Sequence, residues 1–224
     1  MSAPLIGLLV IGQSPRPDLE AEFARVKGKA TLRTLGALDG LDAAALAAVA
    51  PENDADTLYT TLPSGRSVLI SKKAVTQGLE TRLADLDGLG AAVTVLCCTG
   101  RFPSLEAPGV HFASDLLAGA VAAALPQGGR LGVFIPDQAQ AAHAGTRWRE
   151  NGFNPVVVPL RPDAPDDAVV SAAERMKEIA PDLVVHDCIS YGFHARSLAS
   201  GIHGRPALLA SSVAARLAAE LCGA

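Results

Sequence analysis

Two short apolar runs that each end at a cysteine constrain the fold of this chain most. The first is AAVTVLCCTG at residues 91–100, and the second is DLVVHDCIS at residues 182–190. An uninterrupted run of this kind, rich in β-branched residues, is typical of a parallel strand buried on both faces. Ligands of open α/β sheets bind outside the carboxyl ends of such strands. The sequence therefore predicts an α/β fold that delivers Cys98 and Cys188 to the ligand edge of its sheets.

The two halves of the chain repeat one pattern. PLIGLLVIGQSPRP near the amino terminus resembles GRLGVFIPDQAQ, and AVTVLCCTG resembles LVVHDCIS. We therefore expect two pseudo-symmetric lobes, each with a parallel sheet, and a cleft between the lobes. Residues 1–110 with 205–224 form the first predicted lobe, which the last strand and helix complete. Residues 111–204 form the second.

Strand and helix signals alternate along the chain. Residues 104–111 are expected to be an exposed crossing, and Asp18 is expected to cap the helix that follows it. The expected strands are 5–11, 30–38, a hairpin of 58–62 and 66–71, 93–98, 131–135, 156–160, 183–188 and 207–210. The expected helices are 19–26, 43–49, 72–86, 114–125, 138–151, 168–179, 191–200 and 212–221.

Composition narrows the classes of partner. The net charge of −4 comes without a basic cluster, which argues against binding of nucleic acid. The longest apolar run near a helix, 116–125, is far short of the roughly 20 residues of a membrane span. The start lacks the basic region of a signal peptide, and the four cysteines form no CxxC pair. We expect a cytoplasmic protein with reduced thiols. Because its Ala-rich helices carry few charges, we also expect the protein to form a homo-oligomer.

The loop after the first strand, GQSPRPD at residues 12–18, offers groups for binding. Two prolines stiffen it, Ser14 supplies a hydroxyl, and Arg16 supplies a planar fork suited to a carboxylate. Arg16 is therefore a candidate clamp for a substrate carboxylate. The alternative is that Arg16 is an ordinary surface charge.

The residues around the two cysteines suggest an anion site. Thr99 and Gly100 follow Cys98 and can turn a hydroxyl and backbone N–H groups toward an anion. Ser190 and Tyr191 follow the second cysteine and are the matching candidates.

The remaining cysteines and the residues before Cys188 have less definite roles. Cys97 is expected to be a small buried hydrophobic residue, and Cys222 to be incidental. Asp187 and His186 are expected to support Cys188, the aspartate either by holding backbone amides or by tuning the sulfur.

Two thiols on opposite sides of a carbon suit inversion of that carbon. One sulfur, as thiolate, removes the proton, and the other, as thiol, returns a proton to the opposite face. With each sulfur about 3–3.5 Å from the carbon, the pair stands roughly 7 Å apart. No nucleotide-binding glycine loop and no zinc spacing occurs, so we expect neither cofactor nor metal.

The segments IGLLVIGQSPRPD, TVLCCTGRF and VVHDCISYGFH resemble the AroM family, within the aspartate/glutamate/hydantoin racemase superfamily. The resemblance covers essentially the whole chain. It implies a two-lobed racemase-like fold, a cleft without cofactor, and Cys98 and Cys188 as the acid/base pair. The first loop departs from the Gly/Ser pattern of amino-acid racemases.

The predicted function is cofactor-independent racemisation, epimerisation or isomerisation of a small carboxylate, such as an amino acid or a hydantoin-like compound. Two alternatives stay open. One is a decarboxylase or cis–trans isomerase of the same fold that uses one cysteine. The other is a non-catalytic small-molecule-binding protein that is linked to aromatic amino-acid metabolism.

Overall fold

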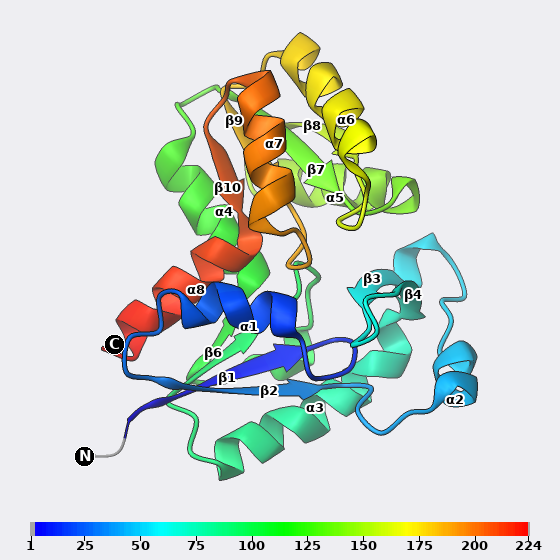
Figure 1. Cartoon of the computed structure of the whole chain (residues 1–224), viewed down its shortest axis with the longest axis vertical. Coiled ribbons are helices and arrows are strands. Elements are labelled where there is room, and N and C mark those ends of the chain that lie inside the picture. Colours follow the sequence, from blue (N-terminus) through cyan, green and yellow to red (C-terminus); the bar gives the residue numbers. More distant parts are fainter. Residues whose placement is uncertain (1–2, 224) are drawn as a thin grey trace. The chain divides into compact units, whose positions relative to one another are not determined.

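The structure is a computed structural model that describes residues 3–223, and it divides into two compact units (Figure 1). Unit 1 holds the chain up to Leu116 and again from Ser211 onward. Unit 2 holds Leu117–Ala210. Both boundaries lie a few residues later in the chain than the expected positions 110 and 204.

Unit 1 is built on a parallel sheet of four strands in the order β2-β1-β5-β6. Figure 1 shows α1 and α8 on one face of this sheet and α3 on the other, as its buried strands require. The strands are β1 (Leu5–Val10), β2 (Thr31–Gly36), β5 (Val93–Leu96) and β6 (Val110–Phe112), and the helices are α1 (Pro17–Ala24), α3 (Lys72–Gly88) and α8 (Ala210–Leu221).

Unit 2 repeats this topology. Its parallel sheet has the order β10-β9-β7-β8, so in both sheets the first strand along the chain lies between the second and the third. The prediction of an α/β fold with two parallel sheets of one build is confirmed. The strands are β7 (Arg130–Ile135), β8 (Asn154–Pro159), β9 (Leu183–His186) and β10 (Ala207–Leu209), and the helices are α4 (Ala113–Ala124), whose first turn belongs to unit 1, α5 (Ala141–Glu150), α6 (Asp166–Ile179) and α7 (Phe193–His203).

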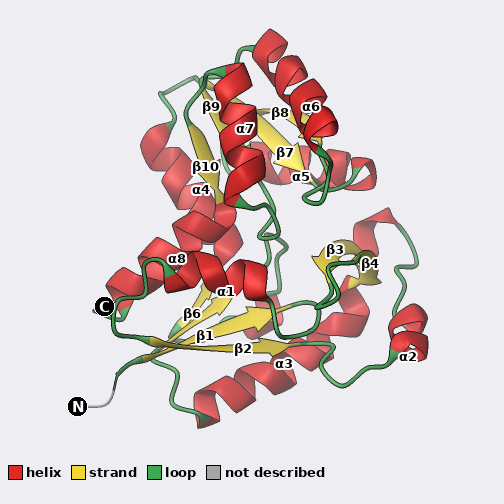
Figure 2. Ribbon diagram, in the orientation of Figure 1, coloured by secondary structure: helices red, strands yellow, loops and turns green. Residues whose placement is uncertain are grey.

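Unit 1 carries a second, smaller sheet. The predicted hairpin is present as β3 (Thr57–Thr61) and β4 (Ser67–Ser71), paired antiparallel and drawn as short arrows in Figure 2. Gly65 has a φ of +82° at its turn, a conformation that favours glycine. The serine that ends β4 then caps α3, since its Oγ accepts the N–H of Ala74 at 3.1 Å. The other short elements are α2 (Ala43–Ala48), η1 (Asp54–Asp56), η2 (Pro103–Leu105) and η3 (Gln138–Gln140).

The structure corrects the expected sheet edges. The last strand, expected in the first lobe, pairs with β9 in the second sheet, where Val184 aligns with Ala207. Only α8 then returns to unit 1. The expected crossing at 104–111 ends in the strand β6, whose three residues are too few for a recognisable sequence pattern.

The structure also corrects two local expectations. β5 and β9 end at Leu96 and His186, so each cysteine lies two residues beyond its strand. The first helix begins at Pro17, and Asp18 lies inside its first turn instead of capping it. Proline suits this position because the first N–H of a helix has no intrahelical acceptor.

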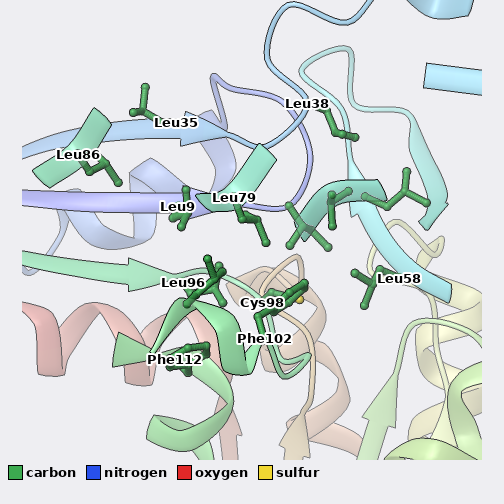
Figure 3. Close-up of a cluster of buried hydrophobic side chains, with 14 residues drawn as sticks. Leu9, Leu35, Leu38, Leu58, Leu79, Leu86, Leu96, Cys98, Phe102 and Phe112 are labelled. Carbon is green, nitrogen blue, oxygen red and sulfur yellow. The ribbon is translucent and has the colours of Figure 1, made fainter. Parts of the chain in front are cut away.

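A cluster of buried leucines and aromatic residues forms the core of unit 1 next to the first cysteine (Figure 3). Cys98 belongs to this cluster, together with Leu58 from the hairpin and Phe102 from the loop beyond the cysteine. The hairpin therefore packs at the carboxyl end of the first sheet. Within residues 3–223, no helix combines the length and the apolar character needed to cross a membrane.

Candidate active site

In unit 1, Cys98 lies in the turn that follows β5. Its side chain is 7% exposed, and its Sγ accepts the backbone N–H of Gly100 at 3.3 Å. A Cβ added to Gly100 would stand 3.4 Å from this sulfur and 3.3 Å from Leu58, so a larger residue would crowd the thiol. The turn thus holds a thiol that is nearly enclosed and in contact with a backbone donor.

In unit 2, Cys188 makes the corresponding contact after β9. It is also 7% exposed, and its Sγ accepts the N–H of Ser190, again two residues later, at 3.5 Å. The residues before the two cysteines correspond as well. Cys97 donates its N–H to the carbonyl of Leu9 in β1, and Asp187 donates to the carbonyl of Phe134 in β7.

A backbone N–H directed at a sulfur stabilises negative charge there, because the donor is fixed and need not reorient. Each turn can therefore support a thiolate, which is the form of cysteine that accepts a proton. The sequence placed the two cysteines in matching positions, and the structure places each of them in the same local geometry.

Asp187 is a buried carboxylate with strong partners on α5. Arg147 forms an ion pair with it, and the indole Nε1 of Trp148 donates to the same carboxylate oxygen at 2.8 Å. The pair is largely shielded from water, with the aspartate side chain 1% and the arginine side chain 16% exposed. These contacts fix the residue directly before Cys188, which favours the supporting role expected for Asp187.

His186 is completely buried between aromatic rings. Its ring centroid lies 5.0 Å from that of Phe134 and 5.2 Å from that of Tyr191, and neither ring nitrogen has a hydrogen-bond partner. Burial first, then the charges of His203 and Arg196, lower the pKa of His186 to about 3. The imidazole is therefore neutral at physiological pH, and its ring packs against Phe134 and Tyr191.

This burial predicts a pH-dependent loss of stability. Between pH 6.5 and about 3 the unfolded chain binds a proton at His186 that the folded chain excludes, so stability falls as the pH is lowered through this range. From pH 7 to pH 5 this one group should lower the free energy of unfolding by about 2 kcal/mol. Urea titrations at both pH values should show the loss reduced by that amount in His186→Gln. His194→Gln, at an exposed histidine, should retain the full loss.

The first loop is held by Asp39, which lies just beyond β2. Its carboxylate accepts the N–H of Ser14 at 2.6 Å, the hydroxyl of Ser14 at 2.8 Å and the N–H of Gly36 at 2.8 Å. The hydroxyl proton of Ser14 is thus directed at Asp39. Toward a substrate, Ser14 then offers its oxygen as an acceptor.

Arg16 is 2% exposed, and its Nε and one terminal nitrogen hold Asp18 at 2.9 and 2.6 Å. Burial alone would raise the pKa of Asp18, but the hydrogen bonds and charge of Arg16 outweigh it and keep that pKa below its ordinary value. Burial raises the pKa of the Cys97 thiol far above neutral, and the charge of Arg16 only partly offsets this. Arg16 is therefore a buried cation near the first cysteine turn rather than a surface charge.

Tyr191 and the other thiols also have defined places. The hydroxyl of Tyr191 donates to the carbonyl of Leu160, so its polar atom serves the fold of unit 2. Cys97 is 1% exposed, and Cys222 lies partly exposed near the end of α8. No disulfide joins any of the four cysteines, all of which lie within residues 3–223. Thr99 lies half-buried in the turn beside Cys98.

Sequence reasoning missed several residues that shape the site. They come from elements distant in the chain, so neither spacing nor pattern links them to the cysteines. Thr60 of the hairpin is one: a Cβ added to Gly12 would lie 2.5 Å from its buried hydroxyl, so the first loop passes directly over it. The others are Leu58, Asp39, Arg147 and Trp148. Among residues 3–223, no three His, Cys, Asp or Glu side chains gather to hold a metal.

The fold is shared with solved enzymes of one superfamily. Arylmalonate decarboxylase matches with a TM-score of 0.67 at 16% identity, over 98% of this chain and 93% of that chain. A glutamate racemase from Bacillus anthracis matches at 0.62 and 12%, over 96% and 80%. The maleate isomerase of Pseudomonas putida S16 matches at 0.58 and 12%, over 95% and 90%. The protein therefore has the two-lobed fold of the aspartate/glutamate racemase-like superfamily.

The chain itself belongs to the AroM family. The family model described as AroM protein matches residues 6–222, which include both cysteine turns. No curated protein matches the sequence. The expected family is confirmed.

Proposed function

We propose that this protein is a cofactor-independent enzyme that inverts or isomerises a small carboxylate, with Cys98 and Cys188 as its acid/base pair. One observation carries the proposal. Each sulfur lies two residues beyond the third strand of its sheet and accepts the N–H of the residue two positions later. Two sheets of the same topology need not carry a cysteine with the same N–H donor at corresponding positions, so this match supports a shared role for the two sulfurs. The solved neighbours with this fold are a racemase, an isomerase and a decarboxylase, which supports this class of reaction.

In the proposed reaction the two thiols differ by one proton. The thiolate removes the hydrogen on the carbon beside the carboxylate, and the electron pair left behind delocalises into the carboxylate as an enediolate. The other thiol then donates its proton to the opposite face, so the configuration inverts and the protonation states of the sulfurs exchange. In the reverse direction the sulfurs exchange roles.

Fixed groups near each thiol stabilise the charge that develops. The half-buried Thr99 and Ser190 follow the cysteines and are the proposed contacts of the substrate carboxylate. Arg16 supplies positive charge to the first turn. We assign Tyr191 a role in positioning the turn of Cys188 and not in binding substrate, because its hydroxyl donates to the carbonyl of Leu160. Ser14 and Gly100 complete the proposed binding residues.

A second candidate function is decarboxylation or cis–trans isomerisation with one essential cysteine. The difference between the two turns favours it: Cys188 follows an aspartate ion-paired with Arg147, whereas Cys98 follows a neutral thiol. Unequal surroundings suit sulfurs with unequal roles. We propose two-cysteine inversion first because the contacts of the sulfurs themselves match.

Incubation of small carboxylates with the protein in deuterium oxide tests the function. NMR reports exchange of the α-hydrogen, loss of carbon dioxide and change of double-bond geometry in one experiment, and polarimetry reports inversion. The proposal predicts deuterium incorporation together with inversion. Decarboxylation without inversion would support the second candidate, and binding without any reaction would support a non-catalytic protein. The expected cytoplasmic location and homo-oligomeric state stay predictions.

The role of Arg16 has its own test. If the guanidinium contacts the substrate carboxylate, Arg16→Lys should raise KM by about tenfold, because an ammonium cannot reproduce a forked contact. Asp18→Asn is the matched control, since it weakens the ion pair but leaves the guanidinium in place. This control should change KM by less than about threefold, as expected for a partly exposed pair. Equal effects of the two substitutions would show that Arg16 acts only by holding Asp18.

A further inference from the structure

Unit 2 contains a pocket at the carboxyl ends of β7 and β8. Its volume is about 480 Å³, within the roughly 300–1,000 Å³ of small-molecule sites. Its walls come from residues 136–138 just beyond β7, from the end of β8 and the loop that follows it, and from the first turn of α6. Neither Cys188 nor Ser190 lines it.

The pocket lies on the same sheet edge as the second cysteine. The order β9-β7-β8 is parallel throughout, so the carboxyl ends of all three strands meet at one edge. Adjacent strands are about 4.8 Å apart, which puts the end of β8 about 10 Å from that of β9. Tyr191, in the turn of Cys188, donates its hydroxyl to Leu160 in the pocket wall. A substrate at the thiol can therefore extend over β7 into this space.

The lining combines apolar residues with one amide, that of Gln138, and with charged groups whose net charge is negative. Arg161 directs Nε and one terminal nitrogen to the two oxygens of Asp163 at 2.9 and 3.0 Å. Asp137 adds a second carboxylate, so the lining holds one guanidinium and two carboxylates. A carboxylate entering here would meet net negative charge. The apolar lining residues are Pro136, Pro159, Leu160, Ala164, Pro165 and Ala168.

We propose that this pocket binds an uncharged, apolar substituent of the substrate, of about the size of an aromatic ring. The preferred substrates are then carboxylates with an aromatic or bulky aliphatic group on the reacting carbon. Substrates with a second, acidic side chain, such as glutamate, are disfavoured. This inference rests on the proposed function for the position of the reacting carbon at Cys188.

Binding of unreactive probes tests the inference without catalysis. Propionate, 2-phenylpropionate and glutarate present one carboxylate with, respectively, a small, an aromatic and an acidic remainder. NMR titration should show 2-phenylpropionate binding at least about tenfold more tightly than the other two, because its ring leaves water. Equal affinities, stronger binding of glutarate or no binding of any probe would overturn the inference.

Variants of α6 locate the ring. Ala168→Phe, in the pocket wall, should reduce the advantage of 2-phenylpropionate over propionate to less than about twofold. Ser171→Phe places the same side chain at an exposed position of the same helix and should keep the advantage. Ala164→Phe fills the pocket from the loop before α6 and should reduce the advantage in the same way. It replaces Ala168→Phe as the test if Ala168→Phe does not fold. An advantage that persists in the folded pocket variants would place the ring elsewhere and overturn the inference.

The two proposals can fail separately. If the wild-type protein exchanges no α-hydrogen but binds 2-phenylpropionate in a way that the pocket variants abolish, the subsite stands and the acid/base function fails. If exchange occurs equally well on acidic substrates and the pocket variants leave it unchanged, the function stands and the subsite fails.

Discussion

Cys98→Ser and Cys188→Ser should each lower the rate of inversion of a confirmed substrate by at least about a hundredfold. A serine hydroxyl is a far weaker acid and base than a thiol at neutral pH, and loss of a general acid or base typically costs 10²–10⁴-fold, roughly. Chiral chromatography of substrate and product measures the effect. Each variant should still exchange the α-hydrogen of one enantiomer with deuterium, because the surviving thiol removes and returns a proton on its own face.

Cys97→Ser is the internal control for both variants. It changes a neighbouring thiol that is 1% exposed, so it should lower stability through a buried hydroxyl but leave the turnover of the folded protein intact. Inversion at the parent rate in both cysteine variants would contradict the two-cysteine mechanism. Loss of activity in Cys188→Ser alone would favour the decarboxylase-type candidate.

Asp187→Ala should destabilise the protein by about 3–5 kcal/mol, the second large effect that we expect. Removing one partner of a buried ion pair leaves the other charge uncompensated. Here the charge left behind is that of Arg147, whose side chain is 16% exposed and would lose its carboxylate partner. The indole N–H of Trp148 would also lose its hydrogen-bond acceptor. Urea unfolding followed by circular dichroism measures the loss.

The exposed ion pair of the same unit provides the control. Arg161 and Asp163 are 58% and 38% exposed, so Asp163→Ala should cost no more than about 1 kcal/mol. Asp187→Asn, which preserves shape and one acceptor, should fall between the two. If Asp187→Ala and Asp163→Ala destabilise equally, Asp187 does not anchor the turn of Cys188 through Arg147.

The strongly patterned parts of the fold could be predicted from the sequence. Buried runs such as 93–96 and 183–186 are apolar throughout because helices cover both faces of the sheet. The edge strands carry less information. β6 and β10 have three residues each, which is too few to show a recognisable pattern. The residues 207–209 therefore do not indicate that β10 pairs with β9 and not with a strand of the first sheet.

The candidate site could be predicted only where its residues follow a strand in sequence. Cys98 and Cys188 met that condition, and the structure gives them matching N–H donors. Asp39 reaches the first loop and Arg147 reaches the turn of Cys188 from other elements, and only the tertiary fold brings them there. The exposure of a charged group is likewise a tertiary property. Arg16, which sequence alone left open as a surface charge, is buried against Asp18.

The reactivity of the four thiols is the most direct test of the central claim, since it requires no substrate. The native protein is treated with iodoacetamide at neutral pH, and mass spectrometry follows the alkylation rate at each cysteine. If Cys98 and Cys188 are the acid/base pair, both should react at least about tenfold faster than Cys97, whose pKa burial raises. Alkylation of both at or below the rate of Cys97 would contradict the account.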